Sequence, residues 1–241
     1  MANWFLGRAL AEEAEAENAA WSFLGEGAAF WVTVAVLLVA GVAVYLVTRK
    51  KSSKKSFWTA KTMAVGAMCM ALSSVLSLIK LWSMPMGGSV TPASMLPLLL
   101  FAYCYGVGPG MVLGALYGVM QFLLDGMAWA ALGAIPNLLD YPIAFGLLGL
   151  AGCFRGSKAK MTAGFVLGCF GRFMASFLSG FIFYGQYAPE GVNPVWYSLT
   201  YNGSYMLVEC IICIALGLLV GERLAKELKK VAMVKKLKKV A

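Results

Sequence analysis

The residues from Ala28 to Thr48 form a run of 21 without a charged side chain, and similar apolar runs recur along the chain. A helix needs roughly 20 apolar residues to cross the hydrocarbon core of a bilayer. Strand-like alternation is absent, and helices satisfy their own backbone polar groups in lipid. The sequence therefore predicts an all-α membrane protein. The composition agrees, because 13% of the residues are charged, against roughly 25% in soluble domains.

Lysine and arginine gather in three clusters beside the ends of apolar runs, at residues 49–55, 155–160 and 223–239. Basic residues mark the cytoplasmic ends of membrane helices. Seven spans with the N-terminus outside and the C-terminus in the cytoplasm place all three clusters on the cytoplasmic side. We therefore interpret the net charge of +9 as a marker of topology and expect no nucleic-acid partner. The last cluster also suits a basic amphipathic helix that lies on anionic lipid.

The apolar runs and the breakers between them predict the order of segments. An extracytoplasmic segment at 1–27 precedes an additional helix at 28–48 and a basic linker at 49–56. A membrane domain follows at 57–221, before a basic cytoplasmic tail at 222–241. Within this domain we expect a tight inner turn at "GVGPG" (106–110) and six helices, at 57–82, 95–105, 111–124, 138–154, 161–184 and 197–221.

The few carboxylates of the last spans fall at the outer mouth or in the outer half of a helix. Asp125 and Glu190 are interpreted as ordinary loop charges. Asp140 and Glu209 are embedded in apolar helix ends, where a carboxylate is costly unless it faces a cavity or a partner. Arg172 lies within a helix, and we expect it either to pair with one of these acids or to contact a ligand.

Aromatic residues gather at the same level as these acids. An interfacial belt explains such residues singly. The triplet Asp140-Tyr141-Pro142, however, joins an acid and a phenol at a helix start. Tyr197 and Asn202 lie five residues apart in the last helix, with Tyr201 and Tyr205 expected on another face. Ring faces attract cations, and carboxylates and amides pair with ring nitrogens and amino groups. Together these residues predict an outward-facing pocket for an aromatic or cationic small molecule.

Small residues repeat at helical spacing in several spans. Ala60, Ala64, Ala67 and Ala71 share one face of their helix, and either internal packing or docking of another membrane subunit explains them. Internal packing is the interpretation of the glycine repeats at 110/114/118, 164/168 and 217/221.

No catalytic constellation is present in the sequence. The chain has no histidine, and the CxxC of Cys210 and Cys213 lies in an apolar run, so we expect neither a metal site nor a cofactor. A Walker motif and a serine in a nucleophile elbow are also absent. The sequence therefore predicts a protein that is not an enzyme.

Four segments resemble the thiamine-specific substrate-binding subunit, or S component, of energy-coupling factor (ECF) transporters. They are "GSVTPASMLPLLLFAYCYGVGPGMVLGALYGVMQFLLD", "NLLDYPIAFGLLGLAG", "GRFMASFLSGFIFYGQYAPEG" and "YSLTYNGSYMLVE". The resemblance implies a six-helix S-component bundle, here preceded by one extra N-terminal transmembrane helix. It also implies a multi-pass protein of the bacterial cell membrane that captures thiamine at the outer face for ATP-driven uptake.

The partners implied by the resemblance are a coupling membrane subunit and two ATPase subunits, as in an ABC transporter. In this family an AxxxA face on the first of the six helices docks on the coupling subunit. Ala67 and Ala71 fit that pattern and Ala60 and Ala64 extend it, so the resemblance favours docking for this face.

The resemblance also implies the site residues. The ligand-contacting acid and tyrosine of the family match Asp140 and Tyr141, and the following helix contributes Gly180 and Tyr184. The last helix contributes Tyr197 and Asn202.

Three positions compare with the family in ways that bear on the ligand. Arg172 matches a basic position near the site. Ser176 stands where the family usually has histidine, and Tyr184 where it often has tryptophan. We therefore expect weaker thiamine binding or a preference for a related pyrimidine or thiazole compound.

Two other functions remain open from the residues. A stand-alone transporter coupled to protons would need a titrating carboxylate, for which Glu209 is the candidate. A structural membrane subunit would bind no ligand.

Overall fold

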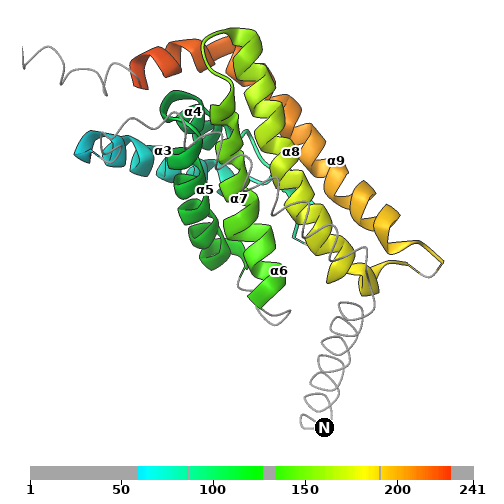
Figure 1. Cartoon of the computed structure of the whole chain (residues 1–241). Coiled ribbons are helices and arrows are strands. Elements are labelled where there is room, and N and C mark those ends of the chain that lie inside the picture. The colour runs from blue at the N-terminus through cyan, green and yellow to red at the C-terminus, as the bar shows by residue number, and fades with distance from the viewer. Residues whose placement is uncertain (1–58, 86, 127–133, 190, 229–241) are drawn as a thin grey trace, which may run out of the picture.

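The computed structural model describes residues 59–85, 87–126, 134–189 and 191–228, which are mostly helical (Figure 1). The predicted helix at 28–48, both its flanking segments and the tail beyond residue 228 lie outside these residues. The first half contains α3 (Ala60–Leu78), β1 (Trp82–Ser83), β2 (Ser89–Val90), α4 (Leu96–Tyr105), α5 (Val107–Gln121) and the π-helical turn η1 (Phe122–Gly126).

The second half forms three longer helical paths. The first is divided into α6 (Ala134–Leu138), the π-helical η3 (Leu139–Ile143), α7 (Ala144–Leu147) and the 3₁₀-helical η4 (Leu148–Cys153). The others contain α8 (Lys158–Ile182), the 3₁₀ turn η5 (Gly185–Tyr187), α9 (Pro194–Leu216) and the π-helical η6 (Gly217–Gly221). The last path stays helical to Leu228, within the predicted basic tail.

Five of the described helical segments are long and apolar enough to cross a membrane: Ala60–Leu78, Val107–Gly126, Ala134–Cys153, Lys158–Ile182 and Pro194–Leu228. The apolar helix α4 is shorter. The prediction of an all-α membrane protein is confirmed. The segments also follow the order predicted for residues 57–221.

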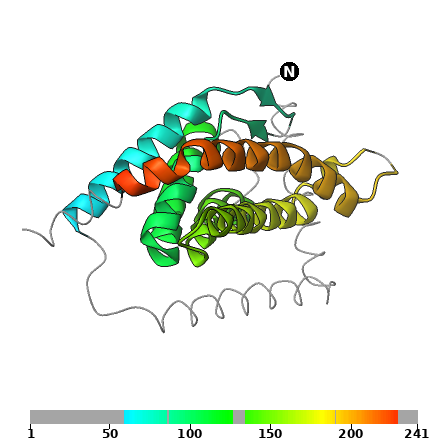
Figure 2. The same cartoon turned by 90° about the horizontal axis from the view of Figure 1, so that it is seen from above.

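The paths lie side by side in a bundle. Figure 1 shows α5, α7 and α8 next to one another, with α9 beside α8. Seen from above, α3 leads into the antiparallel β1–β2 hairpin, which lies near α9 (Figure 2).

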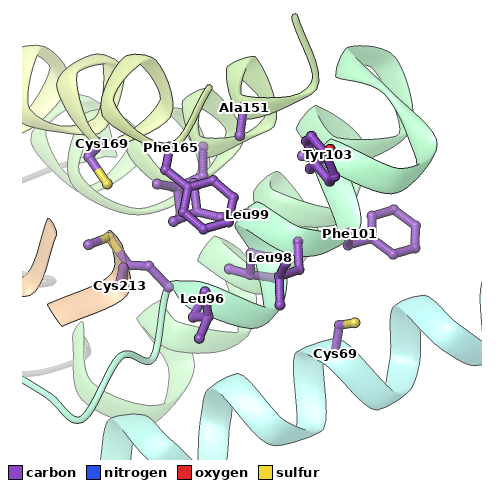
Figure 3. Packing of buried hydrophobic residues seen from close by; sticks show 14 of the residues in the cluster. Cys69, Leu96, Leu98, Leu99, Phe101, Tyr103, Ala151, Phe165, Cys169 and Cys213 are labelled. Atoms are coloured by element: carbon purple, nitrogen blue, oxygen red, sulfur yellow. The ribbon is translucent and has the colours of Figure 1, made fainter. Parts of the chain in front are cut away.

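Helix α4 forms the centre of the core, and all ten of its residues are buried. Figure 3 shows Leu98 and Leu99 of α4 between Phe165 of α8 and Cys69 of α3. An all-round hydrophobic helix is expected where every face meets another helix.

A row of glycines lets the α6–η4 path approach α5 closely. A Cβ at Gly110 would lie 3.1 Å from the backbone of Gly149, and one at Gly118 would lie 2.8 Å from Pro142. The repeats at 164/168 and 217/221 also face neighbouring helices of the chain. Internal packing is therefore confirmed for the glycine sets.

Several predicted boundaries are wrong: the first helix ends at Leu78 with Trp82 in β1, and the helices predicted from 138 and 197 begin at Ala134 and Pro194. Two further differences have a local cause. Only Gly106, with a φ of 104°, interrupts the chain between α4 and α5, and "VGPG" is already helical. Proline is tolerated there because the first turn of a helix has no partner for its backbone N–H groups. Helix α8 begins at Lys158 rather than at residue 161, since the Ser157 hydroxyl caps it by accepting from the backbone N–H of Lys160 at 3.3 Å.

Candidate functional site

A cavity of about 870 Å³, its open mouth included, lies between η3, α8, α9 and the loop of the β1–β2 hairpin. All eight predicted ligand-binding residues line it: Asp140, Tyr141, Arg172, Ser176, Gly180, Tyr184, Tyr197 and Asn202. Residues from three separate helical paths thus meet in one place. That they contact a ligand stays a prediction.

Asp140 and Tyr141 enter the cavity from the π-helical turn η3, which contains Pro142. Proline removes one backbone donor, and π-helical turns often occur at functional sites. The Ser179 hydroxyl donates to Oδ2 of Asp140 at 2.7 Å. The Tyr141 ring packs edge-on against Phe122, with 5.4 Å between the ring centroids. The acid and the phenol are therefore both held by neighbours outside their own turn.

Three tyrosines of α9 form a ladder along the cavity. The ring centroids of Tyr197 and Tyr201 lie 5.9 Å apart, and those of Tyr201 and Tyr205 lie 6.0 Å apart. All three line the cavity with Asn202, so the expectation that Tyr201 and Tyr205 face elsewhere is wrong. Residues four apart on a helix share a face, and this spacing was the signal that could have found them.

The amide of Asn202 is oriented by its own helix. Its Nδ2 donates to the carbonyl oxygen of Ser198 at 3.1 Å, and its Oδ1 accepts from the Tyr205 hydroxyl at 3.0 Å. Gly180 of α8 faces this amide, because a Cβ there would lie 2.8 Å from Nδ2 and still closer to the Ser198 hydroxyl. Gly180 therefore shapes the site by letting α8 and α9 approach each other.

Arg172 and Glu209 form a buried pair beside the cavity. Nη1 of Arg172 lies 3.8 Å from Oε2 of Glu209, which is 1% exposed. The Thr91 and Ser94 hydroxyls both donate to Oε1 of Glu209. The expectation that Arg172 pairs with an acid is confirmed, and Arg172 also lines the cavity.

The hairpin loop is the main part of the site that the sequence did not reveal. Gly87, Gly88 and Ser89 line the cavity, and the backbone N–H of Gly88 donates to the Tyr201 hydroxyl at 3.3 Å. A Cβ at Gly88 would meet the Tyr205 ring at 2.8 Å. Paired glycines are typical of a turn, but nothing in the local sequence indicates that this one packs on α9.

The other lining residues that were not predicted as ligand-binding come from α5, η1, α7 and α9. They are Gln121, Asp125, Phe145, Ser198, Tyr201 and Tyr205. Asp125 pairs with Lys80 at the rim, with 2.7 Å between Nζ and Oδ1. Both side chains are 37% exposed, so this pair contributes little to stability.

Tyr184 lies in the loop after α8, half-buried and with its ring centroid 6.3 Å from that of Tyr187. Burial, reinforced by the nearby Asp140 carboxylate, raises the pKa of Tyr184 above its usual range. Its hydroxyl therefore stays protonated and remains a hydrogen-bond donor.

The charges of the cavity leave one lining carboxylate outside an ion pair. Within the described residues, Asp125 pairs with Lys80 and Glu209 with Arg172, whereas Asp140 is held by the Ser179 hydroxyl. One negative charge, several tyrosine rings and an amide suit a flat aromatic cation. No group of three or more histidine, cysteine, aspartate or glutamate side chains in this part of the chain could hold a metal ion.

The alanine face of α3 points away from the bundle. Ala60, Ala64, Ala67 and Ala71 are all exposed. The buried face of the helix is formed by other residues: Thr62, Val65, Gly66, Cys69, Ser73 and Ser77. Packing within the described chain therefore does not use the alanines.

Residues 63–228 match the family described as thiamine transporter protein (Thia_YuaJ). The chain is 39% identical over 145 residues to the thiamine transporter ThiT of Bacillus subtilis strain 168, a match that covers 54% of this chain and 73% of the relative. It is 33% identical over 134 residues to ThiT of Lacticaseibacillus paracasei, covering 50% and 67%.

The fold is similar to the solved structure of ThiT from Listeria monocytogenes, with a TM-score of 0.61 and 21% identity. This match covers 69% of this chain and 96% of that chain. The resemblance to thiamine-specific membrane proteins and the prediction that the chain is not an enzyme are both confirmed, since the matched family is one of transporters. From the extent of these matches, the chain is a multi-pass membrane protein that belongs to the thiamine transporter protein family.

Proposed function

We propose that this chain is the substrate-binding membrane subunit of an ECF-type ABC importer and captures thiamine, or a close relative of thiamine, at the outer face. The observation that carries the proposal is the meeting of Asp140, the tyrosine ladder and Asn202 in one cavity. Thiamine joins an aminopyrimidine to a positively charged thiazolium ring. Its charge and its two flat rings match this lining.

Each lining group has a role in the proposal. Asp140 and Asn202 hydrogen-bond the pyrimidine. The Nδ2 of Asn202 donates to the carbonyl oxygen and the hydroxyl of Ser198, so its Oδ1, which accepts from Tyr205, offers its remaining lone pair to the ligand. Tyr141, Tyr184 and Tyr197 hold the rings by stacking or by hydroxyl contacts. Ser176 and Tyr184 offer less ring area than histidine and tryptophan, so the affinity is lower or the preferred ligand is a thiamine relative.

The direction of capture follows from the ends of α8. Lys158 begins this helix within a basic cluster, whereas Gly180 and Tyr184 lie at its other end, beside the cavity. Basic residues favour the cytoplasmic side. The cavity then opens outward, with the N-terminus outside and the C-terminus in the cytoplasm of a bacterial cell. The segment division at 1–27, 28–48, 49–56, 57–221 and 222–241 belongs to the same proposal.

The alanine face of α3 is the proposed docking surface for the coupling membrane subunit, through which two ATPase subunits drive uptake. Its support is the exposure of all four alanines on a helix whose other face is buried. Small residues allow close helix approach in lipid, where close packing drives association.

Thiamine binding by the purified full chain tests the capture step. We expect saturable binding with one site per chain, measured by isothermal titration calorimetry. Absence of binding both to thiamine and to its pyrimidine and thiazole relatives would overturn the proposed function. Transport is tested separately in proteoliposomes: uptake that needs the coupling and ATPase subunits supports the importer, and uptake without them supports the alternative of a proton-coupled transporter.

A further inference from the structure

Arg172 is a fixed positive charge at the wall of the cavity. A guanidinium stays protonated at all physiological pH values. Its side chain is 13% exposed, and its Cζ lies 4.1 Å from the centroid of the Phe145 ring. Buried charges interact more strongly than charges in water. Alone, this guanidinium would oppose the entry of any cationic ligand.

Glu209 lies behind Arg172 and is not part of the cavity lining. Its Oε2 faces Nη1 of Arg172 at 3.8 Å, and its Oε1 accepts from the Ser94 hydroxyl at 2.9 Å and from the Thr91 hydroxyl. Hydroxyl donors and a guanidinium together stabilise an ionised carboxylate that has little contact with water. The pairing cancels the charge of Arg172 without adding a further acid to the cavity lining.

The charge of the site therefore depends on a residue that does not touch it. Asp140 and Arg172 alone sum to zero, and Glu209 changes the sum to one negative charge. The rim pair of Asp125 and Lys80 adds nothing to this sum.

We propose that Glu209 is a specificity-determining residue that acts through Arg172, giving the site its preference for singly charged heteroaromatic cations over neutral or phosphorylated relatives. The proposal rests on the proposed function, because it concerns the selectivity of the same cavity. The Thr91–Ser94 turn that precedes α4 fixes Glu209 on the far side of Arg172 and so maintains the preference.

Binding of three probes to the full chain tests this proposal: thiamine, thiamine monophosphate and the neutral pyrimidine alcohol that forms one half of thiamine. In Glu209→Gln we expect the affinity for thiamine, divided by the affinity for the neutral pyrimidine alcohol, to fall by about tenfold or more. The reason is that the positive charge of Arg172 is then uncompensated near the ligand. The ratio of thiamine to its monophosphate should fall as well. A merely structural role would weaken all three probes alike.

The double variant Arg172→Met with Glu209→Gln removes both charges and should restore the selectivity ratio toward that of the unmodified protein. Glu222→Gln is the matched control, because Glu222 lies on the same helical path but is 43% exposed and does not line the cavity. Its carboxylate lies 3.9 Å from Nζ of Lys158. This control should leave all three affinities unchanged.

An unchanged ratio in a Glu209→Gln protein that still binds thiamine would overturn the inference and leave the proposed function intact. If Glu209→Gln does not fold, Arg172→Met is tested instead. Loss of the positive charge should raise the ratio of the affinity for thiamine to that for the neutral alcohol, and a fall in this ratio would contradict the proposal. Failure of the unmodified protein to bind thiamine or any of its pyrimidine and thiazole relatives would instead overturn the proposed function itself.

Discussion

Gly180 of α8 faces Asn202 of α9 so closely that a methyl group at position 180 would lie 2.8 Å from Nδ2 of the amide. The same methyl group would also collide with the Ser198 hydroxyl, which donates to the carbonyl oxygen of Phe177 at 2.7 Å. The two helices that hold most of the cavity are thus joined by a contact that only glycine permits.

We expect Gly180→Ala to lower thiamine affinity by about tenfold, because the helices must separate and the amide must turn. Calorimetric titration measures the change. Gly203→Ala on α9 is the control, since a Cβ there has a single neighbour, Phe173, at 3.8 Å. Equal affinities of the two variants would contradict the assigned role of Gly180.

Asp140→Asn should reduce thiamine affinity by about tenfold or more. The substitution keeps the shape of the side chain but removes the negative charge of a carboxylate that is in no ion pair. Binding of the neutral pyrimidine alcohol should fall less, since an amide still offers an oxygen and two donors. Titration of both probes measures the difference. If the two probes weaken by the same factor, Asp140 does not act through its charge.

Tyr201→Phe should leave the ring ladder in place but remove the hydroxyl that accepts from the Gly88 backbone. The loop of the hairpin then loses a hydrogen bond worth about 1 kcal/mol, so we expect thiamine to dissociate roughly fivefold faster. Stopped-flow fluorescence measures the dissociation rate. An unchanged rate would show that this bond does not hold the loop over the ligand.

Ala67→Leu on α3 should leave thiamine binding intact and prevent assembly with the coupling and ATPase subunits, since a larger side chain blocks close helix approach. Co-purification with these subunits and uptake in proteoliposomes are the measurements. The control is Met68→Leu, because Met68 is 72% exposed on the same helix but outside the alanine row. Normal assembly of Ala67→Leu would remove this face as the docking surface.

Local patterns predicted the elements better than their meeting points. The lengths of the apolar runs predicted the helices. The Asp140-Tyr141-Pro142 triplet correctly predicted a wall of the cavity. The start of α8 was missed because one hydroxyl, that of Ser157, moves it into a basic segment. The place of the hairpin loop was missed because its contact with Tyr201 joins positions 113 residues apart, which no periodicity reports.

Glu209 also shows that the local sequence predicts a feature better than the distant residues that meet it. Its cost in an apolar helix predicted a partner, and Arg172 was the expected basic residue. Its two hydroxyl donors, Thr91 and Ser94, come from a turn whose distance to α9 depends on the packing of the whole bundle.

The complete burial of α4 has a consequence for biogenesis. Its ten residues extend about 15 Å, half of the roughly 30 Å hydrocarbon thickness, and all ten are buried by the rest of the chain. Such a segment has no stable solitary state across a bilayer. We therefore expect it to insert together with α5, across the single-residue break at Gly106, and to be enclosed by α3 and α8 in the folded bundle.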